Sequence, residues 1–448
     1  MKKALIIAAA LILGSASAYA QFGKWQPAEW QKIKDEVTGI ELTVLTDTLK
    51  NDKFIYQTDP MWTYDQKYLM FRSSTRGGSE GETRTTPDGR TMRFAPTYTY
   101  FIEVATGRMI QVTDDGYSTG FLANRSNKLF VTKNSREEWA MYSLDLDKLF
   151  ADANANKTKP IEKYLKLCGK FPMNDAAMGS PGSYCISSED DYAYITVRRQ
   201  GTPEEIAAME AKAFKPRDDQ PIKTRQSLSG IRKMNLKTGK VSFVVNCDFS
   251  VGHIQCSRFH DDEIVFCCET GGDADQRMWY VKADGSEFKP LYNETPLDWV
   301  THETFGTEDY VYFNVLGWQE RLRKQANGIF RINLRTNDVD CLGNVEMDKD
   351  RETQLVGRGF WHCNSTRDNR YACGDTFGGS IWIVDVATGH KYQIASGTRM
   401  VPDHAQPFFS PDGTKLCFQS GKYSGAKRLN LVMVDLTQLP DFKYPSYK

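Results

Sequence analysis

The sequence predicts an all-β protein and, within that class, a seven-bladed β-propeller. The main observation is a repeat: a short strand, a polar turn, a second strand, then a third and a fourth strand recur seven times along the 448 residues. Aromatic residues at 12% and 34 glycines favour strands and turns over long helices. Length agrees, because a propeller can hold a chain of this size in one domain.

Each repeat has a turn rich in Asp, Asn or Gly between its first and second strands. These turns, 44 to 71 residues apart, are Tyr64-Asp65-Gln66, Arg125-Ser126-Asn127, Glu189-Asp190-Asp191, His260-Asp261-Asp262, Glu308-Asp309-Tyr310, Arg367-Asp368-Asn369 and Pro411-Asp412-Gly413. An alternating apolar strand such as YLMFRSS or EIVFCCE follows each one. Four strands per interval of this length are typical of propeller blades.

The two ends of the chain are predicted to close the ring together. The seventh repeat has no fourth strand of its own, because RLNLVMVDL is followed only by a proline-containing tail. Residues 35–45, DEVTGIELTVL, have the pattern of a turn and an outer strand. We therefore expect an N-terminal strand to join the last blade and leave few sheet edges exposed. Residues 200–222 contain a short helix-like run that we expect to project from blade three.

Residues 1–20 have the layout of a cleavable secretory signal. Lys2 and Lys3 precede an apolar run of helix formers, and small residues end at Ala18-Tyr19-Ala20. Cleavage between Ala20 and Gln21 would leave residues 21–448 as a single propeller domain. The apolar run is too short to span a bilayer stably, and Gln21 in place of Cys argues against a lipid anchor. We expect the mature protein to be periplasmic or secreted.

Charge and cysteine content limit the partners. The chain has 57 basic and 57 acidic residues, which predicts binding neither to nucleic acid nor to an anionic membrane. No stretch beyond the leader is long and apolar enough for a membrane span. Ten cysteines in an exported protein could form one or two disulfides. Several, however, lie within apolar strand-like runs, where Cys often serves as a small buried hydrophobe.

Four of the six histidines share one position in the repeat. His253, His302, His362 and His404 lie eight, seven, six and eight residues before the Asp of the next turn. In a propeller this is the start of the innermost strand, so these imidazoles are predicted to converge on the axis. A single histidine near a strand end is usually solvent-facing or hydrogen-bonded, but four equivalent positions argue against coincidence.

Converging imidazoles suit a divalent metal with open coordination positions. Gln406, on the same strand face as His404, would add a side-chain oxygen. Glu303 and Glu269 are candidate carboxylates, although an acid beside a histidine is more often a hydrogen-bond partner of a ligand. The sequence contains no G-x-S-x-G, H-E-x-x-H or phosphate-binding loop motif.

An ordered set of segments resembles the oligogalacturonate lyases, polysaccharide lyase family 22. The segments are Gly252-His253 followed by SRFHDDEIVFCCETG, then RMWYVKADGS, Thr301-His302-Glu303 and HAQPFFSPDG. The resemblance implies a seven-bladed propeller that binds a divalent cation, typically manganese, through histidines and a glutamine. It also implies cleavage of pectic oligogalacturonides by β-elimination.

The resemblance further implies residue roles. His302 and His404 correspond to metal ligands, with Gln406 and His362 as further candidates, and His253 corresponds to the proposed base. This chain departs from the family where His404-Ala405-Gln406-Pro407 replaces His-x-His-Pro and where Val401 replaces a glutamine.

The family's catalytic arginine aligns with Gly230, so nearby Arg232 becomes the catalytic candidate, with Arg225 as another substitute. Arginines at second-strand ends, which could bind sugar carboxylates bidentately, supply substrate-binding candidates in Arg72, Arg76 and Arg199. Glu269 is the remaining substrate-binding candidate.

Two functions from different classes remain open on sequence alone. The first is a metal-assisted lyase that acts on acidic oligosaccharides. The second is a non-catalytic periplasmic propeller, similar to TolB-like domains, that binds a protein or a glycan.

Overall fold

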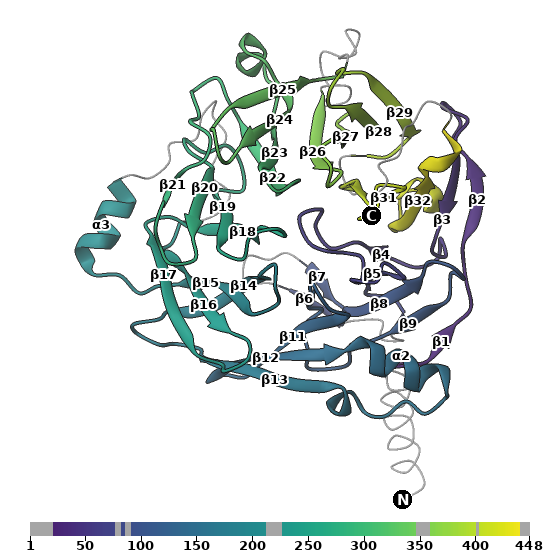
Figure 1. The fold of residues 1–448 in the computed structure, drawn as a ribbon, viewed down its shortest axis with the longest axis horizontal. Helices are drawn as coiled ribbons and strands as arrows, with labels where there is room; N and C mark the ends of the chain where they lie inside the picture. The colour runs from purple at the N-terminus through teal and green to yellow at the C-terminus, as the bar shows by residue number, and fades with distance from the viewer. Residues whose placement is uncertain are drawn as a thin grey trace, which may run out of the picture.

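Seven four-stranded or five-stranded sheets surround a central axis in the computed structural model (Figure 1). The structure describes residues 21–76, 82–85, 91–211, 226–345, 359–399 and 403–439. The predicted seven-bladed propeller is therefore confirmed. The predicted leader and the positions of Arg225 and Val401 lie outside the described residues.

Strands within each blade follow one another antiparallel from the axis outwards. The first strands are β4 (Asp52–Lys53), β10 (Phe121–Leu122), β14 (Ser180–Ile186), β18 (Val251–Cys256), β22 (Val300–Phe305), β26 (Phe360–Ser365) and β30 (Phe408–Phe409). The second strands are β5 (Tyr68–Ser73), β11 (Lys128–Asn134), β15 (Tyr192–Arg198), β19 (Glu263–Cys268), β23 (Tyr310–Val315), β27 (Tyr371–Thr376) and β31 (Lys415–Ser420). Each of the seven predicted turns connects a first strand to a second strand.

The outer half of each blade contains a third and a fourth strand. The third strands are β8 (Tyr98–Glu103), β12 (Glu138–Asp145), β16 (Ser229–Asn235), β20 (Met278–Lys282), β24 (Gly328–Asn333), β28 (Ser380–Asp385) and β32 (Asn430–Asp435). The fourth strands of blades one to six are β9 (Met109–Gln111), β13 (Leu165–Pro172), β17 (Val241–Cys247), β21 (Lys289–Pro290), β25 (Val339–Gly343) and β29 (Lys391–Ser396). Blade one also carries a hairpin of β6 (Glu82–Thr85) and β7 (Thr91–Phe94) between its second and third strands.

The N-terminal segment closes the ring, as predicted. Strand β3 (Glu41–Val44) pairs with β32 and becomes the fourth strand of blade seven. Two further strands were not predicted: β2 (Gln31–Lys34) extends blade seven, and β1 (Trp25–Gln26) pairs with β9 at the edge of blade one. The segment therefore covers both sheet edges at the seam (Figure 1).

Two α-helices lie at the periphery of the described structure. Helix α3 (Pro203–Ala211) has no buried residue and confirms the helix-like run predicted beside blade three. Helix α2 (Leu146–Asn154) was not predicted; Asp145 caps its N-terminus, and its apolar face packs on the core of blade one. No helix in the described ranges is long and apolar enough to cross a bilayer.

Apolar side chains fill the space between neighbouring blades. All six residues of β19 and of β27 are buried, because a second strand is covered on both faces of its sheet. All ten cysteines are free thiols, and nine of them are buried, with Cys341 exposed. The nine buried cysteines thus act as small hydrophobic residues, and the structure contains no disulfide among its described residues.

Candidate active site

A cavity of about 500 Å³ lies at the centre of the ring. Blade one lines it with Tyr56 and Arg72, blade four with His253, and blade seven with His404 and Gln406. The first strands of the blades surround the axis (Figure 1). Residues far apart in the sequence therefore meet in this cavity.

The four histidines predicted to converge lie together. The ring centroids of His302 and His362 are 4.1 Å apart, and those of His362 and His404 are 5.8 Å apart. His253 joins the group through Tyr56, whose ring centroid is 4.9 Å from that of His253 and 6.4 Å from that of His302. Imidazoles from blades four, five and six therefore surround one tyrosine from blade one, and His404 of blade seven lies beside His362.

The backbone of this cluster adopts an unusual conformation. His253, His302, His404 and Gln406 have φ angles of 47°, 58°, 41° and 49°, the left-handed region that residues with a Cβ rarely adopt. The pairing register shifts beside His253 and His302, which indicates a β-bulge at each. Each such residue costs on the order of 1–3 kcal/mol, and strain of this kind gathers at functional sites.

Oxygen acceptors fix the orientation of two of the rings. The carboxylate oxygens of Asp375 lie 2.9 and 3.0 Å from Nδ1 of His362, and Nδ1 of His302 contacts the carbonyl oxygen of Trp361. Metal-binding histidines are commonly oriented in this way, with the other ring nitrogen directed to the metal. Nε2 of each ring is thus left for a ligand.

The electrostatic environment keeps two of these rings neutral. Burial lowers the pKa of His302 well below its ordinary value, and the positive charges of His362 and Arg277 lower it further. Burial and His362 also lower the pKa of His404. A neutral imidazole at pH 7 can bind a cation without first losing a proton.

His253 is linked to a buried chain of charges. Its Nε2 lies 3.2 Å from Oε2 of Glu269, and the guanidinium of Arg277 is 3.9 Å from Glu269 and 3.1 Å from Glu303. Burial raises the pKa of Glu269, but the hydrogen bond from His253 and the charge of Arg277 outweigh it and bring the pKa to about 2. Glu269 is therefore ionised at neutral pH and can stabilise a protonated His253.

Two buried polar atoms at the cluster have no hydrogen-bond partner among the described residues. They are Oε1 of Glu303 and Nε of Arg72. Each unpaired buried polar atom costs about 1–3 kcal/mol. A bound cation or a polar substrate would satisfy them, which indicates that the cavity is a binding site.

The donor set fits a divalent cation. His302, His362, His404 and Gln406 offer imidazole nitrogens and an amide oxygen, which suit first-row divalent metals. A second group consists of His253, Cys267 and Glu269, whose ligand atoms all lie within 4.8 Å of one another. Burial raises the pKa of the Cys267 thiol well above its usual value. His253 and Glu269 of this second group are already paired with each other at 3.2 Å, so we favour the first set.

Arg72, one of the predicted substrate-binding residues, lines the central cavity. Its Nη2 donates to the carbonyl oxygen of Gly120 at 3.3 Å, and burial lowers its pKa. Asp59, in the same cavity, has its pKa raised to about 6 by burial, against the opposing charges of Arg72, Arg258 and His253. The cationic Arg72 and the titratable Asp59, both from blade one, thus lie close enough to interact electrostatically.

The other three predicted arginines lie elsewhere, which corrects their placement. Arg232, in β16, is fully buried and donates to the carbonyl oxygens of Ile231 and Val245 and to Asn246. Its guanidinium is used inside blade three and lines no part of the cavity, so the structure gives its predicted catalytic role no support.

Arg76 and Arg199 are likewise held by other protein groups. Arg76 donates to both carboxylate oxygens of Asp52 and of Glu29, which makes it a structural tie within the N-terminal half. Arg199 donates to the carbonyl oxygen of Ser229 and to Glu205. A strand end places a residue near one face of the ring but does not fix the direction of its side chain.

Sequence reasoning missed four residues of the site: Tyr56, Asp59, Arg277 and Asp375. Asp375 had a usable signal, because it lies one residue before the end of the second strand of blade six, opposite His362. Arg277 precedes a third strand and Tyr56 lies between β4 and β5, and nothing local marks either one. Their place at the site follows only from ring closure.

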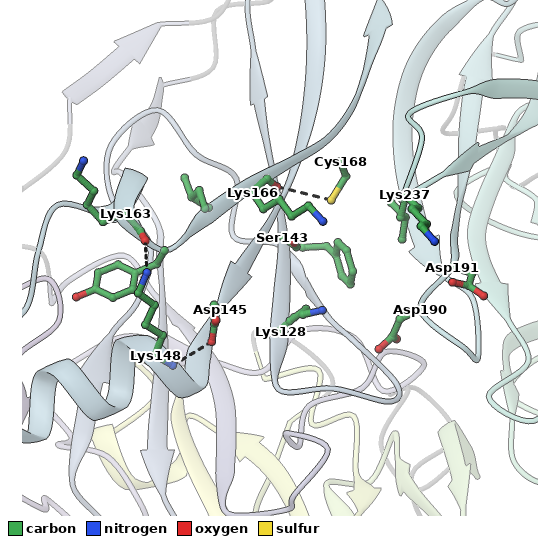
Figure 2. Close-up of a pocket in the computed structure, with 14 residues that line it drawn as sticks. Lys128, Ser143, Asp145, Lys148, Lys163, Lys166, Cys168, Asp190, Asp191 and Lys237 are labelled. Atoms are coloured by element: carbon green, nitrogen blue, oxygen red, sulfur yellow. Dashed lines mark hydrogen bonds between the residues drawn. The ribbon is translucent and has the colours of Figure 1, made fainter.

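A separate cavity of about 370 Å³ lies between blades two and three (Figure 2). Its lining includes five lysines, Lys128, Lys148, Lys163, Lys166 and Lys237. It is built from first-to-second and third-to-fourth strand connections, which lie on the opposite face of the ring from the start of the first strands. None of the predicted site residues lines it.

Comparisons with known proteins agree with the fold and the resemblance. Residues 222–438 match the family model described as oligogalacturonate lyase. The oligogalacturonate lyase of Dickeya dadantii (strain 3937) is 22% identical over 426 residues, which cover 89% of this chain and 94% of that protein. The resemblance to oligogalacturonate lyases is therefore confirmed.

Two solved structures have the same fold. An oligogalacturonate lyase in complex with manganese has a TM-score of 0.67 at 19% identity and covers 93% of this chain and 98% of its own. The oligogalacturonate lyase of Vibrio parahaemolyticus has a TM-score of 0.65 at 16% identity, with coverage of 92% and 98%.

Proposed function

We infer that the chain belongs to the oligogalacturonate lyases, and we propose that it cleaves oligogalacturonides, the acidic oligosaccharides of pectin, by β-elimination. The observation that carries the proposal is a cluster at the centre of the ring, in which His253, His302 and His362 surround Tyr56 and His404 lies beside His362. The match of residues 222–438 to the family model supports the reaction class.

We propose that His302, His362, His404 and Gln406 hold a divalent cation, and that this cation is Mn²⁺. The manganese complex of the structural neighbour supports this choice. When bound, the cation would neutralise the sugar carboxylate and stabilise the negative charge that develops as the C5 proton leaves.

His253 is proposed as the general base. Its Nε2 is paired with Glu269, so Nδ1 is available to accept the C5 proton of the uronate. The carboxylate of Glu269 stabilises the imidazolium that results, and Arg277 holds that carboxylate in place. In this role Glu269 is a positioning residue for the base and does not bind the sugar.

Tyr56 is proposed as the general acid. Burial raises the pKa of its hydroxyl well above the ordinary value, so the group is protonated and able to donate. The elimination then balances: the C5 proton passes to His253, a C4–C5 double bond forms, the C4–O bond breaks, and Tyr56 protonates the leaving oxygen.

Incubation of the purified protein with oligogalacturonides and Mn²⁺ tests the proposal, because the product contains a conjugated enoate that absorbs in the ultraviolet. We expect His302→Ala to lose both metal content and the rise in absorbance. His390→Ala is the matched control, since His390 lies in an exposed turn. Retained activity in His302→Ala would remove that residue from the site, and a wild-type protein without any absorbance change would favour the non-catalytic binding propeller.

We also propose that the protein acts in the periplasm or outside the cell after loss of residues 1–20. The lysines, apolar run and small residues of this segment support the proposal. N-terminal sequencing of the mature protein should begin at Gln21; an intact Met1 on the protein isolated from cells would contradict it.

A further inference from the structure

A further cavity of about 380 Å³, distinct from the one in Figure 2, adjoins the central cavity. Lys53 and Arg72 line both cavities and form their shared boundary. The rest of its lining comprises Asn51, Ser74, Thr75, Ala95, Thr97, Lys427 and Arg428. The two cavities together form one groove that runs from the imidazoles across blade one towards blade seven.

Strand direction places this extension on the same face as the imidazoles. It is built from the start of β4, the end of β5, the start of β8 and the connection between β31 and β32. In an antiparallel blade these points all lie at the edge where the first strand begins. A linear ligand bound at the imidazoles can therefore continue into the extension without crossing the ring.

The lining of the extension is positively charged. It contains Lys53, Arg72, Lys427 and Arg428, and no Asp or Glu occurs among the lining residues that the structure describes. Arg72 reinforces this point, because its Nε is buried without a hydrogen-bond partner in the described part of the chain. A buried donor on a permanent cation calls for an anionic acceptor.

We propose that this extension, defined by Lys53, Arg72, Lys427 and Arg428, binds the carboxylates of sugar units beyond the pair that is cleaved. The inference rests on the proposed function and deepens it: the preferred substrate is an oligogalacturonide of three or more units. Each further unit carries one carboxylate, and arginine and lysine side chains are matched to such groups.

The double variant Lys427→Ala/Arg428→Ala tests this inference, because both side chains are exposed and their loss leaves the core intact. We expect the ratio of kcat/KM for tetragalacturonate to kcat/KM for digalacturonate to fall about tenfold, since charge-assisted hydrogen bonds to the longer substrate are lost. An unchanged ratio would overturn the proposal.

Lys166→Ala/Lys237→Ala provides a control with the same loss of charge. Both lysines line the cavity of Figure 2, on the opposite face of the ring. If this variant lowers the ratio as much as Lys427→Ala/Arg428→Ala does, the effect reflects the overall field of the protein and the proposal is wrong.

Calorimetric titration with tetragalacturonate separates this inference from the proposed function. If the wild-type protein shows no lyase activity, the proposed function fails. The measured affinity for tetragalacturonate then still tests whether the groove binds sugar carboxylates. Weaker binding in Lys427→Ala/Arg428→Ala than in the control supports the groove, and equal binding in the two overturns it.

Discussion

Tyr56 contacts three of the four imidazoles, and its buried hydroxyl interacts with the side chain of Gln57. A hydroxyl held beside imidazoles in a polar cavity is placed to meet a ligand. The carboxylate of Asp375 is almost fully buried yet ionised, because His362 lowers its pKa against the effect of burial. Single residues of this kind define the chemistry of the site.

Tyr56→Phe keeps the ring and removes the proposed acid. We expect kcat to fall by about 10²–10⁴ with the fold unchanged, because a positioned acid contributes an effect of that size. Initial rates measured by ultraviolet absorbance test the loss of kcat. The circular dichroism spectrum tests whether the fold is unchanged. Tyr64→Phe, at a residue that is 55% exposed, should retain full activity. A Tyr56→Phe protein with the wild-type rate would exclude the hydroxyl as the acid.

Asp375→Asn removes the carboxylate that orients His362. We expect the affinity for Mn²⁺ to fall by about 10–100-fold, as is usual when the partner of a metal-binding histidine is lost. Isothermal titration calorimetry measures this change. Asp385→Asn in the same blade, where the carboxylate accepts a turn N–H from Thr388, should bind Mn²⁺ normally. Equal affinities in the two variants would remove His362 from the ligand set.

Asp59 gives the stability a defined pH dependence. Its pKa is raised from 3.8 to about 6 in the folded protein, so the native state holds a proton that the unfolded chain has lost between these values. The contribution of this group therefore favours folding below about pH 4 and is lost as pH rises to about 6. In urea titrations, the stability of Asp59→Asn relative to wild type should rise over that window and level off above it. A difference that stays constant from pH 4 to 7 would contradict the raised pKa.

At the scale of elements, β3 is the strand on which closure depends. It comes from the start of the chain and pairs with β32 near its end, and Leu42 within it is fully buried in the core of blade seven. The sequence predicted this strand because its apolar alternation matches a missing fourth strand. Strands β1 and β2 escaped prediction because they are short and half-exposed or exposed, without a clear alternation.

Leu42→Ala is expected to lower the free energy of unfolding by about 2–5 kcal/mol, the usual loss for a buried leucine. Chemical denaturation measures it. Val37→Ala, in the same segment but 68% exposed, should change stability by less than about 0.5 kcal/mol. Similar small losses in both variants would mean that β3 can detach while the rest of the ring remains folded.

The candidate site was predictable only in part, for a physical reason. The four histidines occupy the same position in successive repeats. Because a propeller places equivalent positions of its blades around one axis, these histidines lie close together. Tyr56 and Arg277 have no such repeated position, and their contacts arise from side-chain packing across blades. The position of Arg232 shows the same limit, because strand position alone cannot tell a side chain that faces the cavity from one enclosed in its own blade.

At the scale of the whole molecule, the proposed cation would connect blades five, six and seven. Its ligands come from three sheets, so a bound ion stabilises the assembled ring and not the unfolded chain. The proposed metal site and the seam closed by β3 lie in the same sector of the ring, since blade seven contributes to both.

Removal of the cation with a chelator should therefore lower the melting temperature as well as abolish activity. A ligand present at 100 times its dissociation constant stabilises by about 2.7 kcal/mol. Differential scanning calorimetry with and without Mn²⁺ measures the shift, and the His302→Ala protein should show none. A wild-type melting temperature that does not respond to Mn²⁺ would argue against a site shared between blades.

The left-handed backbone at His253, His302 and His404 sets catalysis against stability. Glycine adopts that conformation without steric penalty, so it is the residue that the fold alone would select there. A gene duplicate relieved of its enzymatic task should therefore drift towards glycine at these three positions and gain heat resistance as it loses turnover.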